Sequence, residues 1–442
     1  MSFARELNRT LAAGRRAYQN ALKGKTPALY VNGAFASEGL IPGRTGENRL
    51  IQGDNRDVLK ALLADPAVKG KVSLIYIDPP FFSGADYRAV TGSGNEQLKH
   101  RAYSDSWSRG MAAYLKMLYV RIALMRDLLA DDGLLFVHVD WHASHYVRIL
   151  LDEIFGEERF VNEIIWHYKS GGSTKKHFAR KHDNLLVYAK TAKYRFFPQQ
   201  EKSYNRGLKP YRFKGVEEFC DEVGWYTLVN MKDVWAIDMV GRTSGERTGY
   251  ATQKPEQLLE RIIRSATAEG DLCCDFFSGS GTLGAAAAKL GRRFILCDES
   301  RLATEISAAR LMKEEVSFTE ESLKKSSEGG LSVRVAVKRE GNPTGLQKFS
   351  IELKSLNVRG LEEKLAGEEL EKARQMLAEN PLDLLLSWSI DCSAEGGVHR
   401  PDVVFVRGRG EMPLAFSGEI MGGATVSVKV TDIFGDVKIL LF

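Results

Sequence analysis

Apolar residues in the first three hundred positions follow two alternating patterns. Short apolar runs predict buried strands at residues 49–52, 72–77, 133–139, 161–167, 185–189, 272–276 and 294–297. Between these runs, apolar residues recur every three or four positions and predict amphipathic helices, among them 55–63, 111–129 and 144–155. Strands that alternate with helices are typical of an α/β fold. We therefore expect a doubly wound, mostly parallel sheet covered by helices on both faces.

The pattern changes after residue 312. A Lys- and Glu-rich stretch at 314–330 predicts a linker or a frayed helix. Beyond it, the sequence predicts strands at 331–338 and 349–353, a charged helix at 361–379, and strands near 403–406 and 424–430. We expect a helical extension at 1–48, the main α/β domain at 49–315 and a smaller α+β domain at 316–442.

Composition indicates a cytoplasmic, multi-part protein. The chain has 442 residues, of which 44% are hydrophobic, enough to bury a substantial core. No apolar run approaches the roughly 18 residues of a membrane span, and residues 1–20 are polar, which argues against a secretory signal. The five cysteines show no CxxC pairing and three of them fall in predicted core strands, so we expect reduced thiols.

The run LIYIDPPFF at residues 74–82 is the strongest chemical signal in the chain. Consecutive prolines cannot continue a strand interior, because each removes a hydrogen-bond donor and fixes φ near about −65°. The motif must therefore lie just past the C-terminal end of the strand, which is the edge where open α/β sheets bind ligands.

The residue types of this motif suit a reaction at an exocyclic amine of a nucleobase. The amine is a poor nucleophile, and the Asp78 carboxylate together with a backbone carbonyl held rigid by Pro79 and Pro80 offers two acceptors for its hydrogens. Phe81 can stack on the base, which must first leave its duplex. The alternative is a strand-ending turn capped by Asp78. The apolar strand before the motif and the aromatic pair after it favour the chemical interpretation.

A second motif lies downstream, where residues 271–277 (DLCCDFF) lead into the glycine-rich SGSGTLG at 278–284 and a predicted helix at 285–290. Glycines allow a ligand to approach the backbone, and a helix N-terminus offers free N–H groups. The next strand ends at Asp298, an acid suited to ribose hydroxyls. A packing turn and a nicotinamide or flavin site are the alternatives, and the base-handling motif argues against both.

Together the two motifs resemble the S-adenosylmethionine-dependent DNA amino-methyltransferases. Because DPPF precedes the glycine loop, the order resembles the beta class, which includes the modification subunits of type III restriction systems. Residues 52–55, 136–140, 162–166, 182–184 and 250–255 also resemble segments of this family, so the likeness covers roughly 49–312. It implies a Rossmann-like methyltransferase domain that binds S-adenosylmethionine.

The resemblance also implies roles for individual residues. Asp78, Pro79, Pro80 and Phe81 would handle the target amine and its base. The cofactor would be bound by Asp54 at its adenine, by Asp298 or else Glu299 at its ribose, by Gln253 and Lys254 near its carboxylate, and by Phe277, Gly279, Ser280, Gly281 and Thr282 around its methionine end. Methyl transfer needs no metal, and the cluster of His138, His142 and His145 lacks the spacing of a metal site.

Charge and aromatic content predict where DNA lies. The net charge of +5 is too small to establish nucleic-acid binding, but residues 166–215 hold 13 Lys or Arg against two acids, interleaved with aromatics. An ordinary solvated face is the alternative, and the catalytic motifs favour a DNA path. This family class places its target-recognition region at about 191–250. Residues 91–95 (TGSGN) predict a mobile loop that closes over the base.

The resemblance leads to a function with open alternatives. Asp78 favours transfer to adenine N6, because members that act on cytosine N4 more often carry Ser at that position. We expect a DNA methyltransferase of a restriction-modification system that acts on double-stranded DNA. Cytosine N4 transfer, or a DNA-binding specificity subunit that is active only with a partner, are the alternatives. A second copy of the chain and a restriction or helicase subunit are the other candidate partners, and no membrane contact is expected.

Overall fold

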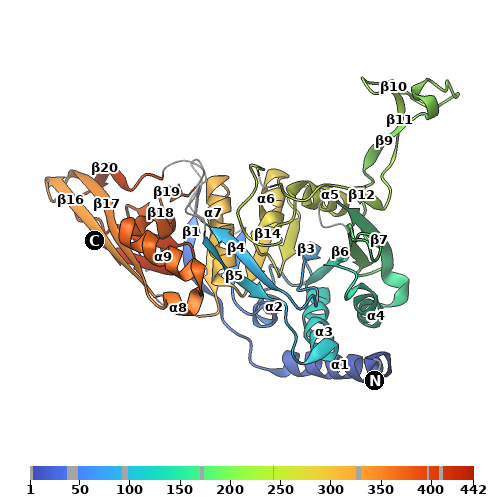
Figure 1. Cartoon of the computed structure of the whole chain (residues 1–442), viewed down its shortest axis with the longest axis horizontal. Helices are drawn as coiled ribbons and strands as arrows, with labels where there is room; N and C mark the ends of the chain where they lie inside the picture. The colour runs from blue at the N-terminus through green and yellow to red at the C-terminus, as the bar shows by residue number, and fades with distance from the viewer. Residues whose placement is uncertain are drawn as a thin grey trace.

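The computed structural model describes residues 3–36, 48–91, 98–169, 174–241, 243–324, 330–395, 398–407 and 412–442. Within them, ten strands form one large sheet at the centre of the molecule (Figure 1). Their spatial order is β1 (Tyr30–Phe35), β15 (Phe318–Ser322), β2 (Arg49–Gln52), β14 (Arg293–Asp298), β13 (Leu272–Asp275), β3 (Val72–Ile77), β6 (Leu129–Val139), β8 (His182–Ala189), β7 (Phe160–His167) and β12 (Val234–Ala236).

The sheet is mostly parallel, as the sequence predicts. All neighbours from β15 to β6 pair in parallel, and so do β7 and β12. Strand β8 runs antiparallel to both β6 and β7, and β1 runs antiparallel to β15. The C-terminal ends of β3, β13 and β14 therefore meet at one edge, where ligands bind in open α/β sheets.

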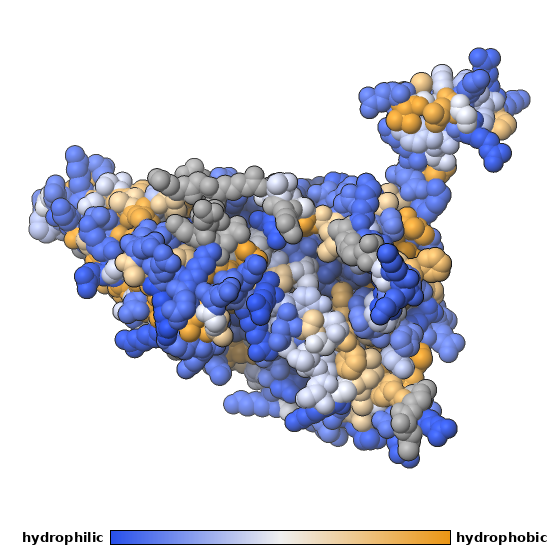
Figure 2. Space-filling view, in the orientation of Figure 1, coloured by the Kyte–Doolittle hydropathy of each residue, from blue (hydrophilic) through white to orange (hydrophobic). Residues whose placement is uncertain are grey.

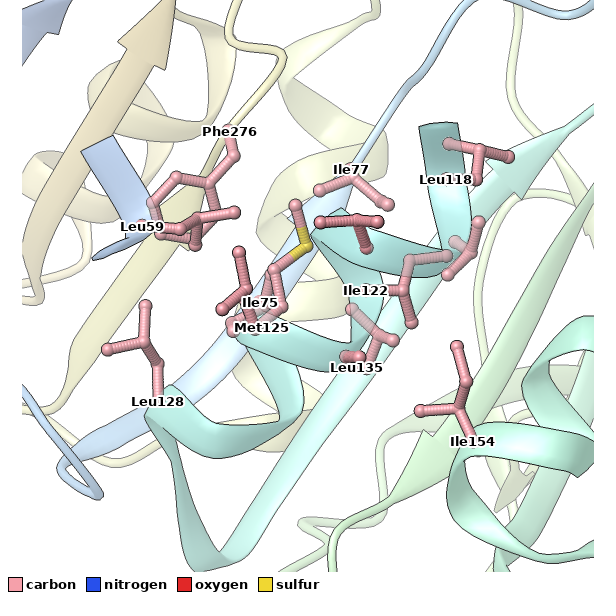
Figure 3. Close-up of a cluster of buried hydrophobic side chains, with 14 of the residues drawn as sticks. Leu59, Ile75, Ile77, Leu118, Ile122, Met125, Leu128, Leu135, Ile154 and Phe276 are labelled. Atoms are coloured by element: carbon pink, nitrogen blue, oxygen red, sulfur yellow. The ribbon is translucent and has the colours of Figure 1, made fainter. Parts of the chain in front are cut away.

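Helices cover both faces of the sheet, so the doubly wound prediction is confirmed. On one face pack α1 (Leu7–Lys23), α2 (Asn55–Leu63), α3 (Gly110–Leu128) and α4 (Ser144–Phe155), and on the other α5 (Glu256–Ala266), α6 (Thr282–Lys289) and α7 (Arg301–Lys313). Strand β3 alternates between them: Ile75 and Ile77 join the first core, and Leu74 and Tyr76 the second. Figure 3 shows Ile75 and Ile77 beside Met125 of α3.

Three strands of this sheet were not predicted: β1, β12 and β15. Strand β1 follows α1 within the expected helical extension, and β15 lies in the stretch expected to be a linker or frayed helix. The acidic side chains of β15 have partners, since the Arg49 Nε of β2 lies 2.7 Å from Glu321 Oε1. The expected boundaries of the main domain, at residues 49 and 315, thus lie next to β2 and β15, which both belong to the main sheet. The division into domains stays a prediction.

The C-terminal part combines two antiparallel sheets with helices, as expected of an α+β unit. The described strands are β16 (Leu331–Gly341), β17 (Leu346–Val358) and β20 (Ala415–Met421) in one sheet, and β19 (Val403–Val406), β18 (Leu385–Asp391), β21 (Ser427–Asp432) and β22 (Val437–Leu441) in the other. The helix predicted at 361–379 is wrong as one element. It is split into α8 (Leu361–Lys364) and α9 (Glu368–Glu379), because Gly367 has φ 61° and ψ −138°.

A three-stranded sheet projects from the body as an arm (Figure 1). The arm, defined here as residues 200–230, contains β9 (Gln200–Tyr204), β10 (Phe219–Cys220) and β11 (Trp225–Asn230). Figure 2 shows hydrophobic residues gathered on it, and Phe213 is 62% exposed. It lies within the stretch that we expected to recognise DNA, 191–250.

Short elements complete the chain. A hairpin of β4 (Asp86–Thr91) and β5 (Leu98–Ser104) lies beside the main sheet, and residues 92–95 of the predicted mobile loop lie outside the described residues. Single-turn helices are η1 (Phe3–Arg5), η3 (Glu157–Arg159), η4 (Arg206–Leu208) and η5 (Pro381–Leu384). None of the described helices is long and apolar enough to cross a membrane.

Candidate active site

A cavity of about 460 Å³ opens at the C-terminal edge of β3, β13 and β14. Its volume lies within the roughly 300–1,000 Å³ of cofactor and small-molecule sites. Nine of the residues that the sequence singled out line it: Asp78, Pro80, Gln253, Lys254, Phe277, Gly279, Ser280, Thr282 and Asp298. The fold therefore brings the two predicted motifs, almost 200 positions apart by number, into one site.

Asp78 and Lys254 form an ion pair in this cavity. Lys254 Nζ donates to Asp78 Oδ2 at 2.5 Å, and the two side chains are only 9% and 17% exposed. The other carboxylate oxygen, Asp78 Oδ1, is buried and has no hydrogen-bond partner within the described residues. One oxygen is thus fixed by a cation, and the other still lacks a donor, which is costly for a buried carboxylate.

A buried histidine lies directly behind Asp78. His138 Nδ1 is 3.9 Å from Asp78 Oδ1 and shares a hydrogen bond of 2.9 Å with the Tyr76 hydroxyl. The His138 Nε2 lies 3.2 Å from Asp183, which also accepts from the Tyr168 hydroxyl. Burial acts to raise the pKa of Asp183, but the hydrogen bond and charge of His138 and the charge of Lys254 bring it below its ordinary value. This network fixes the floor under Asp78.

Of the rest of the DPPF motif, Pro80 lines the cavity, whereas Pro79 and Phe81 lie outside the lining. Pro79 is buried, and the Phe81 ring lies 5.6 Å from the His138 ring and 5.3 Å from Lys254 Nζ. The turn that follows is held by Asp105, which accepts from the backbone N–H groups of Phe82 and Ser83 at 3.1 and 2.7 Å. These bonds hold Phe82 at φ 63°, a conformation rare for a residue with a side chain.

The glycine loop wraps around the start of α6. Gly279 and Gly281 have φ of 51° and 73°, and a Cβ at Gly281 would approach Ser307 Oγ to 2.8 Å. Ser307, on α7, donates to the Gly279 carbonyl at 2.9 Å, and Arg310 donates to Thr282 Oγ1 at 3.1 Å. Helix α7 therefore holds this loop from behind, and left-handed backbone explains why glycine is needed there.

Asp298 ties the loop to the end of β14. Its Oδ2 accepts from the Gly279 N–H and its Oδ1 from the Ser300 N–H, both at 2.9 Å. Burial raises the pKa of Asp298 to about 6, although these two hydrogen bonds oppose the shift. Glu299 also lines the cavity, so both candidate ribose ligands lie at the same wall.

The side chains of two predicted cofactor residues, Asp54 and Gln253, form hydrogen bonds to neighbouring protein groups. Asp54 caps α2 by accepting from the Arg56 N–H, and it also accepts from Arg121 at 2.8 Å, so Arg121 and not Asp54 lines the cavity. Gln253 Oε1 accepts from the Thr248 N–H at 2.8 Å, and its Nε2 donates to the Glu246 carbonyl at 2.6 Å. Gly281, like Asp54, does not line the cavity.

The structure adds lining residues to which the sequence assigned no role of their own. They include Asn55, Tyr103, Trp107, Arg121, Tyr250 and Asp275. Tyr103, at the end of β5, stacks on Tyr87 with ring centroids 4.8 Å apart, and its hydroxyl lies 3.1 Å from Thr252 Oγ1. The hairpin carries no motif around Tyr103, so only the fold reveals it. Asn55 lies within the segment 52–55 that the sequence marked, and its amide donates to the Phe276 carbonyl at 2.7 Å.

The three clustered histidines do different things. His138 is buried behind Asp78, the His142 Nδ1 lies 2.6 Å from Asp140 Oδ2, and the His145 ring lies against Tyr146. In the part of the chain that the structure describes, no group of three His, Cys, Asp or Glu side chains is arranged to hold a metal ion. All five cysteines are free, and Cys273, Cys274 and Cys297 are buried in the core strands where the sequence placed them.

The central sheet is Rossmann-like, and a cofactor-sized cavity lies at its edge between an acid-Pro-Pro motif and a glycine loop. The DNA methylase family of N6 and N4 amino-methyltransferases matches residues 72–309, and the chain belongs to this family. The family uses S-adenosylmethionine as its methyl donor.

Three curated relatives are each similar to about 60% of the chain. The type II methyltransferase M.EcaI of Enterobacter cloacae is 28% identical over 345 residues, covering 64% of this chain and 73% of the relative. The DNA adenine methyltransferase YhdJ of Escherichia coli K12 is 27% identical, covering 58% and 81%. The type III restriction-modification enzyme StyLTI Mod subunit of Salmonella typhimurium is 27% identical, covering 58% of this chain and only 53% of that subunit.

The cavity fits S-adenosylmethionine by the chemistry of its walls. Asp298 offers carboxylate oxygens to hydroxyl groups, and the first turn of α6 offers backbone N–H groups to a carboxylate. Phe277 and Trp107 provide aromatic surface, and the buried acid Asp275, whose pKa burial raises well above its usual range, lies on the floor. The cavity therefore offers suitable groups to both the nucleoside end and the amino-acid end of S-adenosylmethionine.

Proposed function

We propose that this DNA methylase transfers a methyl group from S-adenosylmethionine to the N6 amine of an adenine that has been turned out of duplex DNA. The observation that carries the proposal is the state of Asp78. One of its oxygens is held by Lys254 and the other lacks a donor within the described residues, at the rim of a cavity that also contains the glycine loop. The amine of the base supplies the missing hydrogen.

Asp78, Pro79, Pro80 and Phe81 are the proposed groups that handle the base. The carboxylate and a backbone carbonyl of the rigid Pro-Pro segment accept the two amine hydrogens, which leaves the nitrogen lone pair free to point at the methyl donor. His138 lies behind the carboxylate and fixes its orientation, since the His138 ring is itself held by Tyr76 and Asp183. Phe81 turns its ring toward the base, which offsets part of the unstacking cost.

The remaining predicted residues bind the cofactor in this proposal. The loop around its methionine end contains Phe277, Gly279, Ser280, Gly281 and Thr282, and Asp298 accepts from its ribose. Gln253 and Lys254 line the same cavity, and Asp54 lies behind the lining residue Arg121. Asp54 and Gln253 contribute by fixing Arg121 and the 246–253 turn. When bound, S-adenosylmethionine supplies a methyl group on a sulfonium, which is an activated leaving group. Placing the amine in line is then worth up to about 7–11 kcal/mol.

Adenine is the preferred target for two reasons. Position 78 is Asp, whereas family members that act on cytosine N4 more often carry Ser there. The relatives include YhdJ, which is named a DNA adenine methyltransferase. The StyLTI Mod subunit is named a restriction-modification enzyme, which supports a role in restriction-modification for this chain. Duplex DNA is the proposed substrate, and a restriction subunit is the candidate partner.

The test is direct analysis of modified nucleosides. Purified protein is incubated with labelled S-adenosylmethionine and unmodified duplex DNA of several thousand base pairs, and the digested DNA is analysed by mass. N6-methyladenine is the expected product. N4-methylcytosine as the product would be consistent with the proposed mechanism and would contradict adenine as the target base. No labelled nucleoside, despite measured binding of S-adenosylmethionine, would contradict an enzyme that acts alone and would indicate a subunit that needs a partner.

A further inference from the structure

A second group of side chains gathers beside the DPPF motif, outside the cavity. Ile77 of β3 pairs with Val137 of β6, and Val139 pairs with Asn184 of β8. The segment after β3, the segment after β6 and the segment before β8 therefore lie at the same edge of the sheet. The first carries Asp78, the second carries Trp141, and the third is residues 174–181.

Trp141 is held rigidly at this edge and is still 41% exposed. The guanidinium carbon of Arg180 lies 3.6 Å from the centre of its ring, and the centre of the His142 ring lies 3.7 Å from it at an angle of 32°. His142 is fixed in turn by Asp140 at 2.6 Å. Arg180 and His142 restrict the Trp141 side chain, and a side chain that is already restricted loses little freedom when it contacts a ligand, which favours tight binding.

The residues around Trp141 are basic and open to solvent. Lys175, Lys176 and Arg180 are exposed, and Phe178 is 98% exposed. Within the described residues, no ion pair joins these three cations to a carboxylate. Asp140, next to Trp141, and Asp183, just after Arg180, each lie beside a histidine. Cations without carboxylate partners are free to bind phosphates.

We propose that Trp141, Lys175, Lys176, Phe178 and Arg180, which we call the edge patch, bind the DNA strand that flanks the flipped base. The cations contact the phosphates of this strand, and the two aromatic rings contact the bases next to the position that the flipped base has left. Removing a base from the stack leaves its neighbours without a partner, and inserted or stacked aromatic side chains recover part of that loss. The proposal rests on the proposed function, because it assigns a DNA contact to the same reaction.

Charge neutralisation tests the phosphate contacts. The variant carries Lys175→Gln, Lys176→Gln and Arg180→Gln, and its control carries Arg9→Gln, Arg16→Gln and Lys23→Gln, three exposed cations of α1. The probe is unmodified duplex DNA, and its affinity is measured between 50 and 200 mM salt. We expect about a tenfold or greater loss of affinity only in the patch variant, with a salt slope smaller by about one for each lost phosphate contact.

Trp141→Ala and Trp141→Phe test the aromatic contact. We expect Trp141→Ala to lower kcat/KM for duplex DNA by about tenfold, as lost base stacking does, and Trp141→Phe to retain most of it. Affinity for S-adenosylmethionine and the thermal midpoint serve as controls, and both are expected to stay unchanged because Trp141 lies outside the cavity.

The outcomes separate this inference from the proposed function. If the wild-type protein methylates DNA and the patch variant binds and methylates it as the control does, the edge patch is not a DNA contact and belongs to another partner. If the wild-type protein yields no methylated base, the proposed function fails. DNA affinity of the charge variants then still decides the patch by itself, and absent DNA binding by the wild-type protein overturns both proposals.

Discussion

Lys254 Nζ lies 2.5 Å from Asp78 Oδ2, although 176 positions separate the two residues. Asp78 directly follows β3 and Lys254 lies just before α5, so the ion pair joins the base-handling motif to the segment that leads into the cofactor side of the cavity. A buried carboxylate needs a cation to stay ionised at low cost. The pair therefore holds Asp78 as an acceptor before any base arrives.

The ion pair predicts a large coupling between its two members. Lys254→Met leaves the Asp78 carboxylate buried without its cation and is expected to lower the free energy of unfolding by roughly 3 kcal/mol. Asp78→Ala combined with Lys254→Met is expected to lower it by clearly less than the sum of the single changes. Chemical denaturation of the four proteins measures this. The exposed pair of Arg374 and Glu371 is the matched control, with far weaker coupling. Additive changes at positions 78 and 254 would rule out the pair.

Asp298 predicts a pH-dependent affinity for S-adenosylmethionine. Burial raises its pKa to about 6, so the carboxylate gains its charge as the pH rises through that value. An ionised acceptor binds hydroxyl donors more strongly, and affinity is expected to rise between pH 5 and 7 and then level off. Asp298→Asn is expected to bind weakly and without this step. Calorimetric titration at several pH values checks both, and an identical pH profile in the variant would exclude Asp298 as the titrating group.

The same raised pKa has an opposite effect on the ligand-free protein. The native state binds the Asp298 proton more tightly than the unfolded chain, whose carboxyl has the ordinary value of 3.8. This group therefore contributes a loss of stability as the pH rises from 3.8 to about 6, and a constant cost above it. The difference in unfolding free energy between wild type and Asp298→Asn across this range measures that contribution.

The C-terminal part is predicted to support the cofactor loop. Buried Lys429 of β21 pairs with Glu305 of α7 at 3.3 Å and with Glu320 of β15 at 2.7 Å. Lys429→Met leaves two carboxylates facing each other and is expected to cost roughly 3–5 kcal/mol. Because α7 also holds the glycine loop through Ser307, affinity for S-adenosylmethionine is expected to fall as well.

Thermal unfolding and titration of the donor check the Lys429 prediction. Lys348→Met, at an exposed position of β17, is the control and is expected to change neither quantity. A lower midpoint with full affinity for the donor would mean that α7 keeps the loop in place without the C-terminal part.

Gly281 is predicted to be irreplaceable even by alanine. Its φ of 73° and the 2.8 Å approach of a Cβ to Ser307 Oγ both oppose a side chain. The left-handed conformation alone costs about 1–2 kcal/mol, and the shifted loop is expected to lose affinity for S-adenosylmethionine. Gly345→Ala is the matched control, since its Cβ meets nothing closer than 3.7 Å. Equal affinities in the two variants would contradict the packing described for α7.

Sequence patterns predicted the parts of the fold in which burial decides the structure. The run at 72–77 became β3 with the predicted bounds, because an all-apolar strand suits a sheet covered on both faces. Strand β15 was missed because its sequence, FTEES, is acidic. Its place depends on Arg49 and Lys429, cations that arrive from distant parts of the chain. The helix at 361–379 failed for a local reason, the backbone of Gly367.

The site was predictable to the extent that motifs carry it. The DPPF motif and the glycine loop can be recognised in the sequence by their residue types, and the fold brings both to one cavity. The sequence placed His138 and Asp183 in segments that resemble the family, 136–140 and 182–184, but nothing in their spacing indicated that they lie together behind Asp78. Tyr103 reaches the cavity from a hairpin without any motif. Contacts between distant segments decide these positions, and a single sequence does not contain them as a pattern.

The most direct measurement compares wild-type protein with Asp78→Ala in the nucleoside assay with labelled S-adenosylmethionine. The account predicts N6-methyladenine from the wild type and at least a hundredfold less from the variant, a typical loss for one positioned polar contact to the reacting group, roughly 10²–10³. Donor affinity is expected to stay within a few-fold of wild type. Equal yields of N6-methyladenine from the two proteins would contradict the central claim that Asp78 holds the target amine.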